Sequence, residues 1–400
     1  MKSSQECMNL EATYGAKNYK PIPVVINKAK AEWVWDPEGK KYLDCLSAYS
    51  AVNHGHLHPR IIKAVEDQLN TLTLTSRAFY NDRLGQFLKR LCEVSGFDMA
   101  LPMNTGAEAV ETGIKIARRY SYAKKNIEEN KAEIITAHQN FHGRTTTIVS
   151  FSNDGNATKG YGPYTPGFKN IPFNDAEALE AAITKNTIGF LVEPIQGEAG
   201  VIIPDEGYLK KVREICDKHD ILMILDEIQT GFGRTGKLFA FEHENIKPDL
   251  LLVGKALSGG VIPVSGVLTH KHIMEVITPG SHGSTFGGNP LACAAGEEAL
   301  NVLLDEKLPE RSKELGDYFL NGIKQIDTDL FKEVRGKGLF IAIELKEEAG
   351  GARQYTEALM NKGLLAKETH VHTIRLAPPL VVEKASLDWA ITLLNEVFRG

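Results

Sequence analysis

The stretch DLLLVGK at residues 249–255 joins an apolar strand to a lysine, Lys255. Its four consecutive apolar residues predict a short buried strand, and the glycines of the following ALSGG (256–260) predict a turn. A lysine at the mouth of a buried strand is partly desolvated, which lowers the pKa of its amine and makes it nucleophilic. An isolated lysine at a strand end more often reaches into solvent. The partners of Lys255 therefore decide its role.

The strongest partner of Lys255 is a second apolar run, ILMILDE (221–227), which carries Asp226 at its end. Two strands of one parallel sheet direct the residues at their carboxyl ends into the same crevice. A carboxylate and a desolvated lysine that face one cofactor suit pyridoxal phosphate. The lysine forms a Schiff base, and the acid pairs with the pyridinium nitrogen so that the ring accepts electrons.

Length and composition describe an ordinary soluble protein with more than one domain. The chain has 400 residues and a formal net charge of −5, so we expect one large and one smaller domain and no nucleic-acid partner. No apolar run is long enough to cross a bilayer, and the first residues, MKSSQEC, resemble neither a signal peptide nor a transit peptide. The five cysteines are scattered and form no CxxC pair, which favours reduced thiols in a cytoplasmic protein over disulfides or a zinc site.

The order of patterns along the chain predicts an α/β protein. After an N-terminus without regular structure, strands at 32–35 and 41–46 form a hairpin. Strands at 134–137 and 189–194 then alternate with helices at 178–183 and 208–219, which is typical of a mostly parallel sheet with helices on both faces. From about residue 296 the pattern changes to a compact α+β unit that opens with a helix at 297–305. We therefore expect an N-terminal segment at 1–55, a large domain at 56–295 and a small domain at 296–400.

Two further stretches have the composition of ligand-binding sites. PMNTGAEA (102–109) leads small residues into a helix, whose first amides and dipole attract phosphate. It is neither GxGxxG nor a Walker A loop, so it supports neither a dinucleotide nor a nucleoside triphosphate. Arg144 follows a strand end and could hold a substrate carboxylate bidentately, although a surface ion pair is commoner for an arginine. The alternate histidines of NHGHLHP (53–59) have no carboxylate or cysteine nearby, so we expect a polar loop and no metal site.

Six motifs in order give the chain a family resemblance over essentially its whole length. They are NTGAEA (104–109), FHGRT (141–145), EPIQGE (193–198), DEIQTG (226–231), GKALSGG (254–260) and HGSTFGGNP (282–290). The chain resembles the class III branch of the fold-type I pyridoxal-phosphate aminotransferases. The resemblance implies a large domain with a mostly parallel, seven-stranded type of sheet flanked by helices, and a smaller α+β domain built from both termini.

Three other stretches resemble the ornithine δ-aminotransferases within that branch: YGAKNY (14–19), LTLTSRAFY (72–80) and IRLAPPL (374–380). The resemblance implies transfer of the δ-amino group of L-ornithine to 2-oxoglutarate. The products would be glutamate and glutamate-5-semialdehyde, which cyclises to pyrroline-5-carboxylate, so the reaction would belong to arginine metabolism or proline biosynthesis. One departure is GVIP (260–263), where related enzymes tend to carry a tyrosine before the proline; it lies outside the functional set.

The resemblance also implies roles at the cofactor ring. Lys255 would form the Schiff base and then move a proton between substrate and cofactor, while Asp226 would pair with the pyridine nitrogen. Gln229 would approach the ring hydroxyl, and Phe141 would stack on the ring. Glu193 would support the site from its strand end.

The cofactor phosphate would be held by two chains. Gly106 and Ala107 would cradle it from one subunit, and Ser284 and Thr285 would reach it from the partner subunit. The resemblance therefore implies a homodimer, or a larger assembly, with its active sites at the subunit interface.

The implied substrate residues surround the same cavity. Tyr19 and Arg144 would fix the α-carboxylate of ornithine, with Tyr49 lining the pocket. Arg375 would bind the α-carboxylate of glutamate, and Glu198 would pair with Arg375 while ornithine is bound.

Two alternatives stay open. An acetylornithine or 4-aminobutyrate aminotransferase would share the same branch, although Tyr19, Tyr49 and Arg144 favour a free amino-acid end over an acetylated one. A catalytically silent, cofactor-binding protein of the same fold is the other alternative. The presence of both Lys255 and Asp226 argues against it, since a silent relative is free to lose either residue.

Overall fold

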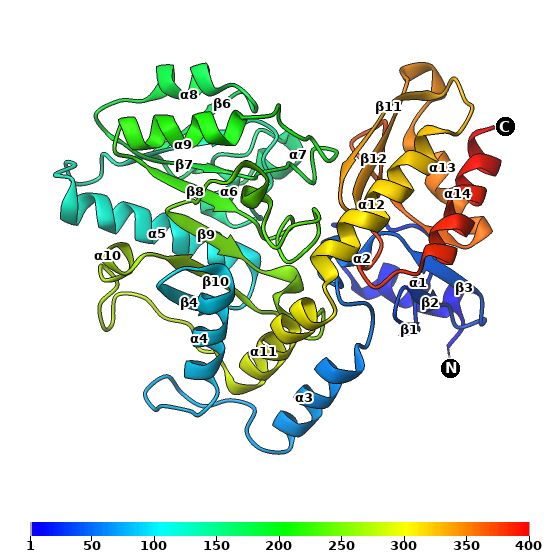
Figure 1. The fold of residues 1–400 in the computed structure, drawn as a ribbon, viewed down its shortest axis with the longest axis horizontal. Coiled ribbons are helices and arrows are strands. Elements are labelled where there is room, and N and C mark those ends of the chain that lie inside the picture. Colours follow the sequence, from blue (N-terminus) through cyan, green and yellow to red (C-terminus); the bar gives the residue numbers. More distant parts are fainter. Residues whose placement is uncertain (1, 400) are drawn as a thin grey trace.

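The computed structural model describes residues 2–399 and is built around a seven-stranded sheet (Figure 1). Within the described residues, β10 alone runs opposite to the other strands of this sheet, which confirms the expected mostly parallel α/β fold. In spatial order the strands are β4 (Met99–Met103), β10 (Ser265–Thr269), β9 (Leu250–Val253), β8 (Leu222–Asp226), β7 (Thr187–Val192), β5 (Glu133–Ala137) and β6 (Phe168–Ile171).

Helices cover both faces of this sheet, so its central strands are buried along their whole length. Successive side chains of a strand point to opposite faces. On β8, Met223 and Leu225 pack into the cluster on one face, and Leu222 and Ile224 into the cluster on the other. The covering helices are α8 (Ala176–Ala182) and α9 (Tyr208–Lys218) on one face, and α5 (Gly106–Lys124) and α10 (Lys271–Met274) on the other (Figure 1).

The small part of the molecule contains two further four-stranded sheets. One is built from C-terminal strands alone, and helices α12, α13 and α14 pack near it (Figure 1). Its strands, in spatial order, are β11 (Phe331–Lys337), β12 (Phe340–Leu345), β15 (Thr373–Leu376) and β14 (Lys367–Thr369); the helices are α12 (Leu308–Lys324), α13 (Ala352–Lys362) and α14 (Lys384–Phe398).

The other small sheet joins the two ends of the chain. The predicted N-terminal hairpin is present, and its last strand pairs in parallel with a short C-terminal strand, so that Leu43 lies opposite Leu364. This pairing is the reason why a smaller domain contains residues from both termini; the boundaries at 55 and 295 stay predictions. The strands are β1 (Lys28–Lys30), β2 (Trp33–Trp35), β3 (Lys41–Asp44) and β13 (Leu364–Leu365).

A buried arginine, Arg234, joins the large part of the molecule to the C-terminal sheet and to the N-terminal segment. Arg234 is fully buried, and its guanidinium donates to Leu339 O (2.8 Å), Pro378 O (2.7 Å) and Asn53 Oδ1 (2.6 Å). Burial lowers the pKa of Arg234 to about 9. Leu339 and Pro378 flank the same end of the antiparallel β12–β15 pair, and Asn53 belongs to the N-terminal segment, so one side chain joins these pieces.

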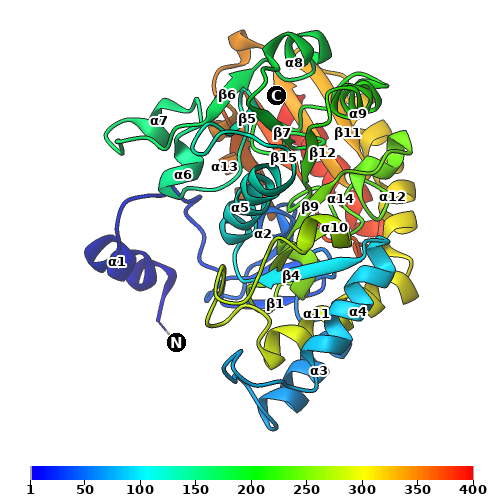
Figure 2. The same ribbon diagram turned by 90° about the vertical axis from the view of Figure 1, so that its left-hand side faces the viewer.

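Two helices differ from the sequence-based expectation. The N-terminus, expected to lack regular structure, forms α1 (Ser4–Tyr14), which buries no residue and stands away from the body in Figure 2. The helix expected at 297–305 begins earlier, as α11 (Pro290–Asp305), because the Asn289 side chain caps it by accepting from Ala292 N (2.9 Å). It packs against α3 (Pro59–Leu69) and α4 (Leu84–Ser95).

The remaining elements are short: α2 (Ser47–Ser50), α6 (Thr146–Val149), α7 (Gly155–Thr158), η1 (Ala240–Glu244), η2 (Lys255–Ser258) and η3 (Glu347–Ala349). Among residues 2–399, no helix combines the length and the apolar character that crossing a membrane requires.

The alternate histidines of the 53–59 stretch contact three different partners. His54 contacts Ala299 O, His56 contacts Asp44, and His58 contacts Glu306.

Candidate active site

A cavity of about 190 Å³ lies where β7, β8 and β9 end. The predicted cofactor residues line this cavity, apart from Ser284 and Thr285. The lining residues come from segments that lie more than a hundred residues apart in the sequence. Its lining residues are Gly106, Ala107, Phe141, His142, Gly143, Glu193, Ile195, Asp226, Ile228, Gln229, Thr230 and Lys255.

Lys255 opens the η2 turn directly after β9 and has a positive φ of 43°. Non-glycine residues rarely adopt this conformation, and such strain is typical of functional sites. Burial lowers the pKa of the Lys255 amine; the carboxylate of Glu198 opposes this change, and the cation of Arg375 adds to it. No residue in the described part of the chain forms a hydrogen bond or ion pair with Lys255 Nζ. The amine is therefore available to react.

Asp226 is held by two donors at the end of β8. Its Oδ1 accepts from Ile228 N (3.0 Å), and its Oδ2 contacts His142 Nδ1 (2.7 Å). Burial by itself lowers the pKa of His142, but the hydrogen bond and charge of Asp226 outweigh it, so the pKa is raised. His142 lies inside the FHGRT motif, but no local pattern marks it as a site residue. Its role is to fix the orientation of the Asp226 carboxylate.

Glu193 lies buried beside this pair, at the end of β7. Its Oε2 accepts from Phe141 N (3.0 Å), which anchors the backbone that carries the Phe141 ring. Burial raises the pKa of Glu193 to about 7, and the positive charge of His142 opposes the rise. Glu193 therefore lines the cavity directly after the end of β7, and its supporting role stays a prediction.

The start of α5 lines the same cavity through Gly106 and Ala107. Thr105 and Glu108 form a capping box, in which Glu108 Oε2 accepts from Thr105 N (2.7 Å) and Thr105 Oγ1 from Glu108 N (3.3 Å). The amides of Gly106 and Ala107 have no acceptor among the described residues, and they lie at the positive end of the helix dipole. A Cβ on Gly106 would approach Ile228 to 3.2 Å. This arrangement fits a phosphate group.

Ser284 and Thr285 are absent from the lining of this cavity. Ser284 Oγ accepts from Asn104 Nδ2 (3.0 Å) and Gly287 N (2.9 Å), close to the start of α5. Both of these contacts use the oxygen as an acceptor, so the hydroxyl hydrogen stays available for a phosphate. The structure thus leaves the predicted contribution of Ser284 and Thr285 to a partner subunit as a prediction.

Glu198 and Arg375 form an ion pair at the side of the cavity. Arg375 Nη1 donates to Glu198 Oε1 (2.7 Å), Gly197 O (3.1 Å) and Gln229 Oε1 (3.2 Å). Arg375 is almost fully buried. Burial by itself raises the pKa of Glu198, but the cations of Arg375 and Lys255 outweigh it, so the pKa is lowered. The pair connects the small domain strand β15 to the cofactor residue Gln229.

The other predicted substrate residues lie farther out. Arg144 lines an adjoining cavity of about 550 Å³, with Glu198 on its wall, and lies 3.8 Å from Asp154 with both side chains exposed. Tyr49 is half-buried, and its ring centroid lies 5.1 Å from Arg375 Cζ. Tyr19 is 73% exposed, and the structure does not bring it into either cavity.

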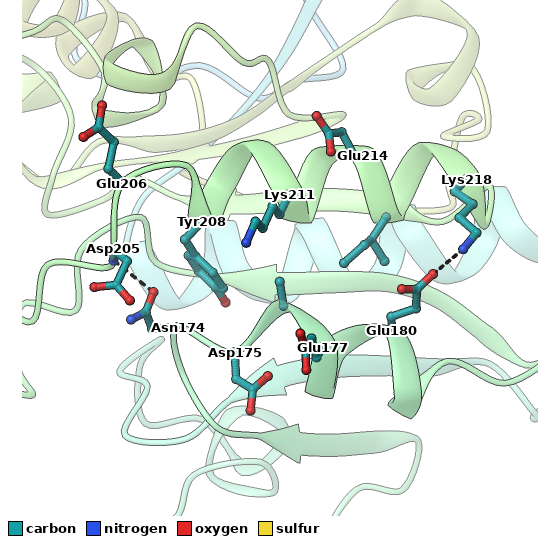
Figure 3. Close-up of a pocket in the computed structure, with 12 residues that line it drawn as sticks. Asn174, Asp175, Glu177, Glu180, Asp205, Glu206, Tyr208, Lys211, Glu214 and Lys218 are labelled. Atoms are coloured by element: carbon teal, nitrogen blue, oxygen red, sulfur yellow. Dashed lines mark hydrogen bonds and ion pairs between the residues drawn. The ribbon is translucent and has the colours of Figure 1, made fainter.

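A separate hollow of about 570 Å³ lies between α8 and α9 and contains several acidic side chains (Figure 3). One of them, Glu180, pairs with Lys218 (2.6 Å). None of its lining residues belongs to the predicted site. Within residues 2–399, no group of three or more His, Cys, Asp or Glu side chains could hold a metal ion.

Comparison with known proteins gives one consistent result. The chain is 58% identical to ornithine aminotransferase 2 of Staphylococcus aureus (strain MRSA252), over 100% of both chains. Its structure is similar to that of ornithine aminotransferase from Toxoplasma gondii ME49, with a TM-score of 0.98, 43% identity and coverage of 100% of this chain and 96% of that one. It is also similar to acetylornithine aminotransferase from Elizabethkingia anophelis, with a TM-score of 0.90, 48% identity and full coverage of both chains.

The profile of the class III aminotransferases matches residues 14–398. This match agrees with the arrangement of the cavity, in which a free lysine amine, a held carboxylate and a helix start face one another. The chain belongs to the class III aminotransferase family.

Proposed function

We propose that the protein is a pyridoxal-phosphate-dependent aminotransferase that moves the δ-amino group of L-ornithine to 2-oxoglutarate. The observation that carries the proposal is the Glu198–Arg375 ion pair, 2.7 Å long, beside the free amine of Lys255. When bound, the cofactor supplies an electron-accepting ring that stabilises negative charge on the reacting carbon. The products are glutamate and glutamate-5-semialdehyde, which cyclises to pyrroline-5-carboxylate.

Each cavity residue has a distinct task in this reaction. Lys255 would attach the cofactor through its desolvated amine and would then move a proton between the reacting substrate carbon and the cofactor. Asp226, oriented by His142, would pair with the ring nitrogen, and Gln229 would approach the ring hydroxyl. Phe141 would stack on the ring, from the segment anchored to Glu193.

The two substrates make opposite demands on Arg375. Ornithine presents an ammonium group at its distal end, which a free arginine repels, whereas glutamate presents an α-carboxylate, which the arginine attracts. Glu198 resolves this conflict by pairing with Arg375 in one half-reaction and releasing it in the other. Arg144 and Tyr19 would hold the far carboxylate of ornithine, and Tyr49 would line the pocket. A partly buried ion pair adds little net stability, so its value here is as a switch.

Glu198→Gln should therefore leave Arg375 permanently available. We expect the glutamate half-reaction to be kept or improved, and the preference for the δ-amine of ornithine over its α-amine to fall by about tenfold, the factor that corresponds to about 1.4 kcal/mol. Single-turnover kinetics with each donor, with mass-spectrometric identification of the nitrogen lost, measures both. Glu214→Gln, on the exposed side of α9, is the matched control. Equal losses with both donors and an unchanged choice of nitrogen would make Glu198 a structural residue.

The substrate assignment is tested by comparing amino donors. With 2-oxoglutarate as acceptor, ornithine should give a higher kcat/KM than N-acetylornithine or 4-aminobutyrate. The similarity to an acetylornithine aminotransferase makes the first comparison the decisive one. A preference for N-acetylornithine would overturn the assignment while leaving the reaction class in place, and no turnover with any donor would point to a silent protein.

The proposal includes a homodimer in which Ser284 and Thr285 complete the phosphate site of the partner subunit. Co-expression of Lys255→Ala chains with Thr285→Ala chains should then restore activity that neither variant has alone at limiting cofactor. About one quarter of the parental sites are expected, since half of the dimers in an equal mixture are mixed and each contains one complete site. No recovery in dimers whose mixed composition is verified, or a fully active monomer by ultracentrifugation, would contradict shared sites.

We also infer a cytoplasmic location and a role in arginine or proline metabolism. All five cysteines are free, three of them buried, which suits a reducing compartment. The amino donor and the cyclising product provide the metabolic link.

A further inference from the structure

Four consecutive residues, Ser47–Ser50, have a left-handed backbone. Their φ angles are 49°, 46°, 60° and 70°, and none of the four is glycine. L-residues disfavour this region and visit it as single residues rather than as turns. A whole left-handed turn therefore persists only where the surrounding contacts enforce it.

Two side chains enforce this turn. Asp44 Oδ1 accepts from Leu46 N and Ser47 N, both at 2.9 Å, and its Oδ2 is held by His56 Nε2 (2.8 Å). Ser47 Oγ donates to Ala377 O (2.7 Å). The carboxylate of Asp44 fixes the entry to the turn, and the hydroxyl of Ser47 fastens it to the chain that follows β15.

The turn and the strand β15 carry two residues of the substrate site. Tyr49 lies within the turn, and its ring centroid is 5.1 Å from Arg375 Cζ. Arg375 lies two residues before Ala377, whose amide also donates to Cys45 O (2.7 Å). These contacts of Ala377 join the turn to the segment after β15. The turn carries Tyr49 and β15 carries Arg375, so the contacts also bring the Tyr49 ring to the guanidinium.

The ring matters most when Glu198 releases Arg375. Among residues 2–399, the guanidinium then keeps its neutral contacts to Gly197 O and Gln229 Oε1 and its contact with the face of the Tyr49 ring. An aromatic face attracts a cation and limits how it can turn. Tyr49 thereby keeps the guanidinium directed at the cavity after Glu198 has released it.

We propose that Asp44 and Ser47 are positioning residues for carboxylate recognition: they hold the left-handed turn that places Tyr49 against Arg375. The inference rests on the proposed function, because it needs Arg375 to bind the carboxylate of 2-oxoglutarate and glutamate. It predicts an effect confined to the half-reaction in which Arg375 is free. In the ornithine half-reaction Arg375 is paired to Glu198, so the orientation of its guanidinium does not depend on the turn.

Ser47→Ala in the full-length holoenzyme tests the proposal. The KM for 2-oxoglutarate should rise about fivefold, the effect of one lost hydrogen bond, while the single-turnover rate with saturating ornithine changes by less than about twofold. Ala48→Gly, at an exposed position in the same turn, is the matched control: it relieves the strain, raises Tm and leaves both half-reactions unchanged. The double variant Ser47→Ala/Ala48→Gly should recover part of the lost 2-oxoglutarate affinity, because glycine adopts the turn without help.

Three outcomes would overturn the positioning role. They are an unchanged KM for 2-oxoglutarate in Ser47→Ala, equal losses in both half-reactions, and no recovery in the double variant. If Ser47→Ala does not fold, Asp44→Asn keeps the shape of the side chain and must give the same split between half-reactions. The parental enzyme is assayed alongside with ornithine and 2-oxoglutarate. Its failure to turn over would contradict the proposed function, whereas normal parental turnover with an unaffected variant contradicts only the positioning role.

Discussion

Replacement of Lys255 by alanine is expected to remove nearly all turnover while the cofactor still binds noncovalently. The variant loses both the amine that attaches the cofactor and the group that moves the proton. General acid–base catalysis alone contributes ~10²–10⁴-fold, and the loss of the nucleophile adds to this. The remaining contacts of the cavity, including the free amides of Gly106 and Ala107, are unchanged, so the phosphate site is kept.

Steady-state turnover with ornithine and 2-oxoglutarate measures the loss, and cofactor absorbance after gel filtration measures retention. Lys89→Ala removes a lysine that forms only an exposed contact with Glu93 (3.6 Å), and it should retain parental activity. A Lys255→Ala variant with turnover near that of the parent would contradict the role of Lys255 as the catalytic amine.

Asp226→Asn is expected to have the next largest effect. The amide keeps an oxygen for Ile228 N but loses the negative charge that pairs with the ring nitrogen and with His142. Removal of one preorganised electrostatic partner lowers kcat by ~10²–10³-fold. The measurement is kcat at saturating cofactor, with Asp217→Asn as the control at an exposed carboxylate on α9. A fall in cofactor affinity without a fall in kcat of the loaded enzyme would restrict Asp226 to a binding role.

The central part of the fold and its two key residues follow from local patterns. The apolar runs before Asp226 and Lys255 are β8 and β9, and parallel neighbours necessarily bring their carboxyl ends together. His142 could not be found in this way, because its hydrogen-bond partner lies 84 residues away. The same holds for Arg375 and Glu198, 177 residues apart, which were identified only through the family resemblance.

Two of the missed features have physical explanations in the sequence itself. The capping box of Ser3 and Glu6 that starts α1 is visible as S-x-x-E, but the helix has no buried face, so no apolar period indicates it. The Asn289-Pro290 pair has the residue types of a helix start, but it also forms the end of the family motif HGSTFGGNP, which hides this signal. The left-handed turn at Ser47–Ser50 is different. It contains no glycine, and its cause is a set of contacts to distant residues that no local pattern contains.

The pairing of β3 with β13 has a consequence for biosynthesis. A ribosome releases Leu43 long before its partner Leu364, and the residues of the seven-stranded sheet are made between the two. Domains fold as units during synthesis, and contacts between distant residues form late. The N-terminal hairpin therefore lacks its partner strand β13 while the large domain is being made. During this time the side chain of Val34, which is buried in the complete fold, stays exposed. A chain that terminates before β15 can therefore contain Lys255 and Asp226 and still lack Arg375.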